Sequence, residues 1–250
     1  MGLRLFDCNA NIGLRMSAPL EEPTTVGELL EEMDRLEIDA ALVSHYAGFE
    51  SEPLLGNARL DEEIGGHPRL QRAWTVLPDT GGDMPPASDF IGQLVLSGAR
   101  AARLYPQKNE WCLDEWCAGA LLRALEERKV PTMIPQDQTN LRDLHGVLGR
   151  HPALPIILSR ASYRQNRMLF PLLEQHSNLY IDLSPTYVVH HGIEALCSRN
   201  HAEQLLFGTG YSRCEPGASI THIMYADISE EQRELIAHGN LERLIAGVVE

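Results

Sequence analysis

The sequence predicts a (β/α)8 barrel, the TIM-barrel fold, as a single domain over residues 1–250. Eight short apolar segments alternate with segments of helical periodicity, and this alternation is typical of parallel strands joined by helices. The length of 250 residues is usual for such a barrel, and a hydrophobic content of 44% is enough for one large core. No glycine-rich phosphate loop follows the first apolar segment, which disfavours an open nucleotide-binding sheet.

The first half of the chain should supply four strands, each an apolar run that stops at a turn or polar residue. The capping box Thr25-Val-Gly-Glu28 should begin a helix that runs to about Glu37. A loop and a short helix are expected over 47–69, and a longer helix over 88–97. The predicted strands cover residues 5–13, 39–45, 71–77 and 99–105.

The second half should supply the other four strands, at residues 131–135, 155–159, 178–184 and 204–209. Asp114 is a candidate cap for a long helix, and a further helix is expected over 141–149. We expect Pro171 in or near the first turn of the helix after the sixth strand, where proline is tolerated. The last helices should begin at the capping box Ser229-Glu-Glu-Gln232 and break near Gly239-Asn240.

Composition excludes several classes of partner. The formal net charge of −14 disfavours a nucleic acid or an anionic membrane, because both select a cationic surface. No apolar run has membrane-spanning length, and no signal-peptide pattern is found, so we expect a soluble protein of the cytoplasm. The five cysteines are an odd number and are widely scattered, which predicts thiols rather than a disulfide framework.

The first predicted strand carries the most informative polar residues. Side chains alternate between the faces of a strand, so Asp7, Asn9 and Asn11 should share one face and point toward one place. Active sites of such barrels lie at the carboxyl ends of the strands, which is where these residues fall. An amide oxygen is a neutral, hard ligand and is much poorer than imidazole for zinc.

Four segments together resemble the amidohydrolase superfamily, in particular its amidohydrolase-related, decarboxylase-like branch. The first is Asp7-x-Asn9-x-Asn11, where the family has Asp-x-His-x-His. The next two are Pro131-Thr-Met-Ile-Pro135-Gln136 and Ile157-Leu-Ser-Arg160, where family segments read like Pro-Val-Leu-Ile-His and Val-Leu-Ser-His. The fourth is Leu206-Phe-Gly-Thr-Gly210, where the family has an aspartate after Leu-Phe-Gly-Thr. The resemblance covers nearly the whole chain in order.

The resemblance implies a metal-dependent hydrolase or decarboxylase, but each position that holds a metal ligand in the family is changed here. Either Pro135 or Gln136 stands at the position after strand five, and Arg160 and Gly210 stand at the later two. We therefore expect no metal ligand at these positions and no cofactor. The alternative is one divalent metal, zinc or manganese, in a relocated site that uses donors such as His45, Asp182, His190 or His191.

The remaining strand-end residues predict a site for a small anion. Arginine binds carboxylate and phosphate groups through two parallel hydrogen bonds. An internal salt bridge of Arg160 with Asp7, Asp137 or Asp182 is the competing interpretation. The predicted catalytic acids or bases are His45, His190 and His191, because histidine titrates near neutral pH. The predicted substrate-binding residues are Asn9, Asn11, Arg103, Gln136, Arg160 and Tyr211.

Three functions remain open from the sequence. The protein is a divergent family member that binds a small anion without catalysis, an enzyme that hydrolyses or decarboxylates a small carboxylate without metal, or a hydrolase with a relocated metal. Family members often form dimers, so a homodimer is a further expectation, with Trp111 and Trp116 as candidate interface residues.

Overall fold

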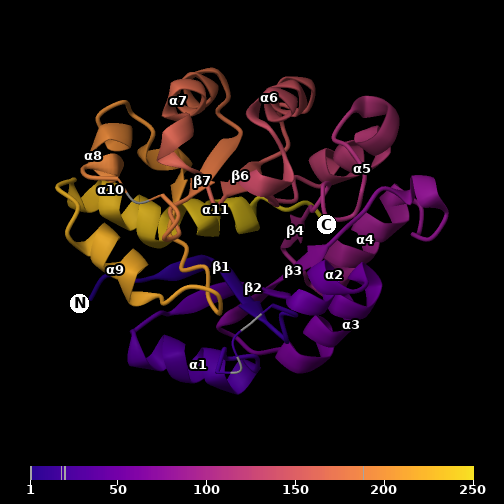
Figure 1. Ribbon diagram of the computed structural model, residues 1–250, viewed down its shortest axis with the longest axis horizontal. Coiled ribbons are helices and arrows are strands. Elements are labelled where there is room, and N and C mark those ends of the chain that lie inside the picture. The colour runs from indigo at the N-terminus through magenta and orange to yellow at the C-terminus, as the bar shows by residue number, and fades with distance from the viewer. Residues whose placement is uncertain (1, 18, 20, 188) are drawn as a thin grey trace.

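The computed structural model describes residues 2–17, 19, 21–187 and 189–250, and it confirms the predicted barrel (Figure 1). Every neighbouring pair of strands is parallel, and the strands follow one another around the sheet in sequence order. Backbone hydrogen bonds from Cys8 N to Phe207 O (2.9 Å) and from Asn11 N to Tyr211 O (2.7 Å) join the first strand to the last segment and close the barrel. The strands are β1 (Phe6–Ile12), β2 (Ala40–His45), β3 (Leu70–Thr75), β4 (Ala101–Arg103), β5 (Thr132–Pro135), β6 (Ile156–Ser159), β7 (Leu179–Asp182) and β8 (Leu205–Leu206).

Helices surround the barrel on its outside (Figure 1). Both predicted capping boxes are present, at Thr25 and at Ser229, so local sequence fixes where α1 and α10 begin. None of the described helices has the length and apolar character needed to cross a membrane. The helices are α1 (Val26–Arg35), α2 (Tyr46–Glu50), α3 (Pro53–Ile64), α4 (Ala87–Ser97), α5 (Glu115–Glu127), α6 (Leu141–Arg150), α7 (Asn166–Gln175), α8 (Gly192–Cys197), α9 (Gly217–Met224), α10 (Glu230–Glu234) and α11 (Asn240–Ala246).

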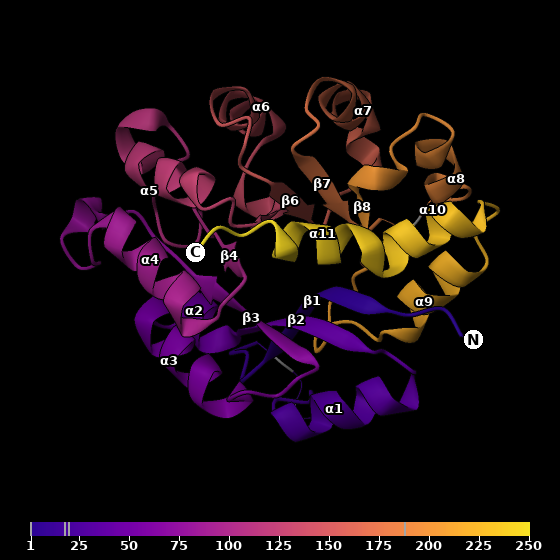
Figure 2. The ribbon, with the colours of Figure 1, turned by 180° about the vertical axis from the view of Figure 1, so that it is seen from behind.

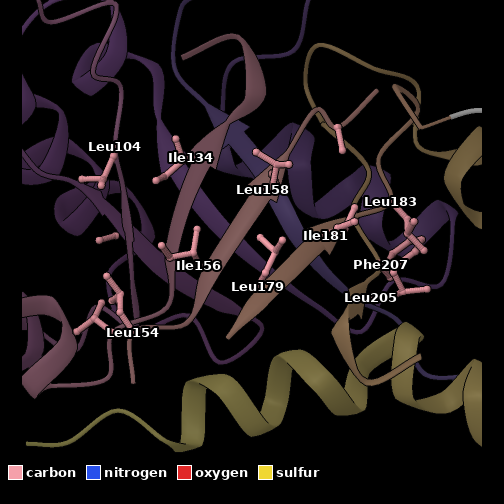
Figure 3. Packing of buried hydrophobic residues seen from close by; sticks show 14 of the residues in the cluster. Leu104, Ile134, Leu154, Ile156, Leu158, Leu179, Ile181, Leu183, Leu205 and Phe207 are labelled. Atoms are coloured by element: carbon pink, nitrogen blue, oxygen red, sulfur yellow. The ribbon is translucent and has the colours of Figure 1, made fainter. Parts of the chain in front are cut away.

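The apolar core has two layers. The larger layer lies between the strands and the surrounding helices, where side chains such as Ile134, Leu158 and Ile181 point outward from the strands (Figure 3). The smaller layer fills the barrel interior, and α11 contributes Leu241 and Leu244 to it. Figure 2 shows α11 lying across one end of the barrel. That end is closed by packing, which leaves the carboxyl ends of the strands for a site.

Three local expectations are wrong. Residues 47–69 hold two helices, α2 and α3, rather than a loop with one short helix. Pro171 lies inside α7, because α7 begins at Asn166 after a single 3-10 turn. The expected break near Gly239-Asn240 is a π-helical turn over Leu235–Gly239 that runs directly into α11. That turn leaves the Ile236 carbonyl to accept a hydrogen bond from Phe207 N in the barrel wall.

The alternation predicted for the first strand is also interrupted. The pairing of β1 with β2 shifts register between Asp7 and Ala10, which is the effect of a β-bulge. Phe6 and Cys8 therefore belong to the barrel interior, whereas Asn9 is the next residue that reaches the open end. Asp7 does not share the cavity-facing side with Asn9 and Asn11.

Candidate functional site

A cavity of about 310 Å³ opens at the carboxyl ends of the strands, and we call it the strand-end cavity. The ends of β1, β4, β5 and β6 and the loops after β7 and β8 all contribute to it. No aspartate, glutamate or histidine is among the described residues that line it. Its lining is Asn9, Asn11, Arg15, Tyr46, Phe49, Arg103, Tyr105, Pro135, Gln138, Ser159, Arg160, Ser184, Thr186, Gly210, Arg213 and Cys214.

Arg103 is the buried cation of the strand-end cavity. It ends β4, and only 3% of the residue is exposed. One hydrogen bond is found for its guanidinium, from Nη2 to the Ala10 carbonyl at 3.4 Å, and Nε has no partner among the described residues. An unpaired buried donor is costly, more so when it carries charge. An anion in the cavity would satisfy it.

Three further arginines line the same cavity, but two of them are already paired. Arg15 makes a two-point contact with Glu22, at 3.2 and 2.6 Å, and Ser212 Oγ donates to the same carboxylate. Arg160 Nη1 lies 2.9 Å from Asp137 Oδ2, so the salt-bridge interpretation of Arg160 holds, with Asp137 as its partner. Arg213 is exposed and has no salt bridge within the described part of the chain.

One wall of the cavity is aromatic. The rings of Phe49 and Tyr105 pack edge to face with centroids 4.7 Å apart, and Tyr46 lies beside them in the lining. Lys108 Nζ stands 5.2 Å from the centre of the Phe49 ring, and its backbone N–H donates to Gln138 Oε1 (2.8 Å). These contacts fix the wall, which offers aromatic surface to a ligand in the cavity.

The amides of β1 are held by other residues of the barrel. Asn11 Nδ2 donates to the Tyr211 carbonyl (3.0 Å), and Asn11 Oδ1 accepts from Ser44 Oγ (2.7 Å). Asn9 Nδ2 donates to Asp182 Oδ2 at 2.7 Å. Both side chains are therefore preorganised parts of the cavity wall.

Two carboxyl groups lie buried beneath this wall. Asp182 also accepts from Ser184 N (2.8 Å), and its burial raises its pKa to about 6. Asp7 accepts from the Asn9 and Thr209 backbone N–H groups and from Thr209 Oγ1, so it ties β1 to the segment after β8. Burial raises the pKa of Asp7 despite these hydrogen bonds and the nearby charge of Arg103.

The structure places four of the predicted substrate-binding residues together in the strand-end cavity: Asn9, Asn11, Arg103 and Arg160. The other two lie outside its lining. Gln136 Oε1 accepts from Ser162 N (2.8 Å) and so fixes the loop after β6. Tyr211 is 3% exposed and lines a neighbouring groove with Glu28 and Glu32.

The three predicted catalytic histidines are not in the lining of the strand-end cavity either. His45 lies in a separate groove beside Gly13 and Arg59, where its Nδ1 accepts from Ala47 N and its Nε2 is 3.4 Å from Glu63. Burial lowers the pKa of His45. His190 and His191 are exposed, and their rings meet edge to face with centroids 3.9 Å apart.

Several lining residues were missed because they follow strand ends by a few positions. Tyr46 and Phe49 belong to α2, which begins directly after β2 where a loop was expected. Arg15 lies two residues past Gly13, whose φ of +82° turns the chain away from β1. Arg213 is the third residue after Gly210, in the segment that closes the barrel. Only Tyr46 had a sequence signal, since it follows His45 at the end of the predicted strand.

Solved structures with the same fold include two decarboxylases and one hydrolase. A 5-carboxyvanillate decarboxylase from Novosphingobium aromaticivorans, in complex with manganese and 4-hydroxy-3-methoxy-5-nitrobenzoic acid, has a TM-score of 0.79 at 13% identity, over 98% of this chain and 96% of that one. A 2,6-dihydroxybenzoate decarboxylase from Rhizobium has 0.71 at 14%, over 98% and 99%. A probable 2-pyrone-4,6-dicarboxylic acid hydrolase from Acinetobacter baumannii, with citric acid bound, has 0.66 at 13%, over 97% and 99%.

The prediction of no cofactor is contradicted by the Novosphingobium complex, which contains manganese. The donors of this chain do not form a conventional site for one. Zinc sites use three or four nitrogen, sulfur or carboxylate ligands, and no group of three His, Cys, Asp or Glu converges within the described ranges. Asp7 and Asp182 already accept hydrogen bonds through both of their oxygens. We assign no reaction step to a metal.

Sequence comparison gives the family directly. No match was found among curated protein sequences. The family model described as amidohydrolase matches residues 12–246, which is nearly the whole chain. It covers every residue that lines the strand-end cavity except Asn9 and Asn11. The chain belongs to the amidohydrolase family.

Proposed function

We propose that this protein binds a small planar carboxylate in the strand-end cavity and hydrolyses or decarboxylates it. The observation that carries the proposal is the state of Arg103, which lines the cavity. The residue is 3% exposed, and its Nε has no hydrogen-bond partner among the described residues. A carboxylate matches the geometry of a guanidinium and would replace the missing hydrogen bonds.

The rest of the cavity supports this class of ligand. The aromatic wall of Phe49 and Tyr105 suits a flat ring, and Arg213 at the rim offers a second cation to a ligand with two acidic groups. The similar proteins are named for such molecules: a carboxyvanillate, a dihydroxybenzoate and a pyrone dicarboxylic acid. The manganese of the first makes Mn²⁺ the cofactor to test first.

A second candidate function is binding without turnover. It is favoured by one observation, namely that no aspartate, glutamate or histidine is among the described residues lining the cavity. Hydrolysis and decarboxylation both require a group that moves a proton, and these residue types are the usual ones. Cys214 lies in the lining, but burial raises the pKa of its thiol, which makes it a weak nucleophile at neutral pH.

The test compares 2,6-dihydroxybenzoate with 1,3-dihydroxybenzene, which has the same ring and hydroxyl groups but no carboxylate. We expect calorimetry to detect binding of the acid. The neutral ring should bind at least about tenfold more weakly. Arg103→Met should remove this preference, because methionine keeps the volume of the side chain and loses the charge. Arg123→Met, at a surface arginine of α5, is the matched control.

Turnover is measured with the same acid, with and without added Mn²⁺, as release of carbon dioxide. Release of carbon dioxide that depends on the protein supports the proposed enzyme. Binding of the acid without release of carbon dioxide supports binding without turnover. Equal affinity for the acid and the neutral ring, or unchanged affinity in Arg103→Met, would overturn the proposal.

A further inference from the structure

Two histidines on the outside of the barrel face each other, and neither lines the strand-end cavity. His145 lies in α6 and His176 directly follows α7. His145 Nδ1 is 2.8 Å from His176 Nε2, and the two rings are inclined at 62°. Both helices are also anchored in the outer apolar core, α6 by Leu144 and α7 by Leu172.

The two facing nitrogens can both become metal ligands. In the hydrogen-bonded pair, one of the two facing nitrogens carries a proton. Moving that proton to the other nitrogen of the same ring leaves two lone pairs directed at each other, with no net loss of a proton.

The distance between the facing nitrogens is close to the separation that a metal requires. Zinc binds imidazole nitrogen at about 2.0–2.1 Å, which puts two ligands of a tetrahedral site roughly 3.3 Å apart. The rings would have to separate by about 0.5 Å and each turn by roughly a few tens of degrees, so that both lone pairs point at one metal beside the line between the nitrogens. Rotation of two partly exposed side chains can provide both movements. Gly149, one turn after His145, leaves the side of the pair open, and a Cβ built there would lie 3.9 Å from His176 Cε1.

We propose that His145 and His176 form a surface site for one divalent transition-metal ion that joins α6 to the end of α7. Imidazole ligands favour copper, nickel and zinc over magnesium or calcium. No third His, Cys, Asp or Glu joins the two within the described residues, so water completes the coordination. One consequence is that metal found in the purified protein need not lie at the strand ends.

The test is a titration of chelator-treated protein with Zn²⁺ alone. Calorimetry measures the affinity, and ¹⁵N NMR of the histidine rings identifies the ligands. The wild type should bind one zinc that shifts the signals of His145 Nδ1 and His176 Nε2. His145→Ala and His176→Ala should each weaken that event about tenfold or more. His67→Ala, in the connection between α3 and β3, is the matched control and should bind zinc as the wild type does.

A gain of affinity provides an independent check. Gly149→His places a third imidazole on the same face of α6, four residues after His145, and should tighten zinc binding by about tenfold. Zinc bound at the strand ends would remain in both alanine variants and would not respond to Gly149→His. Unchanged affinity in the alanine variants, or no tightening in Gly149→His, would overturn the site.

Discussion

At the scale of single residues, Asp182 should control how stability depends on pH. Its pKa is about 6 in the folded protein and 3.8 in its usual state, so between these values the folded protein holds a proton that the unfolded chain releases. The free energy of unfolding should therefore fall as pH rises from about 4 to about 6, by on the order of 3 kcal/mol, and the loss should be complete above pH 6. The raised pKa of Asp7 acts in the same direction.

Asp182→Asn should remove the share of this pH dependence that comes from Asp182. The amide cannot ionise, and its oxygen can still accept from Ser184 N. Urea unfolding at a series of pH values from 4.5 to 7.5 measures the slope, with Asp83→Asn at an exposed carboxyl as control. A slope in Asp182→Asn equal to that of the wild type would mean that other groups cause the dependence.

Thr209 is a second residue whose effect can be isolated. Its hydroxyl is fully buried, donates to Asp7 Oδ2 and accepts from Tyr211 N at 3.0 Å. Thr209→Val keeps the shape but removes both hydrogen bonds, and it should lower the free energy of unfolding by about 1–3 kcal/mol. Thr221→Val, at an exposed hydroxyl of α9, should change it by less than about 0.5 kcal/mol. Similar losses in the two variants would contradict the assigned role of Thr209.

At the scale of elements, the contact between α2 and α3 depends on two glycines. A Cβ at Gly56 would lie 2.1 Å from the backbone nitrogen of Gly48, so the two helices would have to move apart. Gly56→Ala should lower the free energy of unfolding by about 1–3 kcal/mol or more. Because α2 carries Tyr46 and Phe49, the same variant should weaken binding of 2,6-dihydroxybenzoate.

Gly27→Ala in α1 is the matched control for that prediction. A Cβ there meets only Thr25 Oγ1, at 3.9 Å. Alanine is the better helix former, so we expect a gain of stability of up to about 1 kcal/mol and unchanged ligand binding. Urea unfolding and calorimetry measure both variants, and a loss in Gly27→Ala as large as that in Gly56→Ala would remove the steric explanation.

Local sequence predicted elements well where the determining interaction is itself local. The capping boxes at Thr25 and Ser229 lie within four residues, and both are present. The bulge in β1 was missed, because it depends on pairing with β2 and with the segment after β8, which lies about 200 residues away. The π-helical turn over Leu235–Gly239 was missed for a similar reason. The carbonyl of Ile236 in this turn accepts a hydrogen bond from the backbone N–H of Phe207, which is distant in the sequence.

The same distinction applies to the site. Asn9 and Asn11 were found because they lie in the predicted first strand toward its carboxyl end, and Arg103 and Arg160 because they end a strand or follow it directly. The fold brings all strand ends to one place. Arg15, Phe49 and Arg213 reach the cavity from loops and a short helix, whose paths no periodic pattern fixes. Asp137 was one of three partners considered for Arg160, and loop geometry selects it. The pairing of Arg15 with Glu22 was not predicted, because it also depends on the path of a loop.

At the scale of the whole molecule, the protein separates the end that should bind a ligand from the end that stabilises the barrel. Four arginines line the strand-end cavity of a chain whose formal net charge is −14. Arg15 and Arg160 are neutralised by Glu22 and Asp137, which leaves Arg103 and Arg213 without a salt bridge among the described residues. The low dielectric of the cavity walls strengthens the attraction of these two cations for an anion that has entered it. The opposite end is filled by α11, which contributes Leu241 and Leu244 to the inner core.

This separation predicts that a substitution at the closed end changes stability without changing ligand affinity. Leu241 of α11 is 2% exposed and packs in the inner core with Phe6 and Leu206. Leu241→Ala should lower the free energy of unfolding by about 2–5 kcal/mol, because it leaves a cavity inside the barrel. The dissociation constant for 2,6-dihydroxybenzoate should stay within a factor of about two, since distant sites act independently.

The control for this prediction is Val249→Ala, at a residue that is 45% exposed, which should change the free energy of unfolding by less than about 0.5 kcal/mol. Urea unfolding gives the stabilities, and calorimetry on the folded protein in buffer gives the affinities. A large loss of affinity in Leu241→Ala would show that packing at the closed end is transmitted to the strand-end cavity. In that case β1 is the connection to examine, because it carries Phe6 and Cys8 in the inner core and Asn9 and Asn11 in the cavity wall.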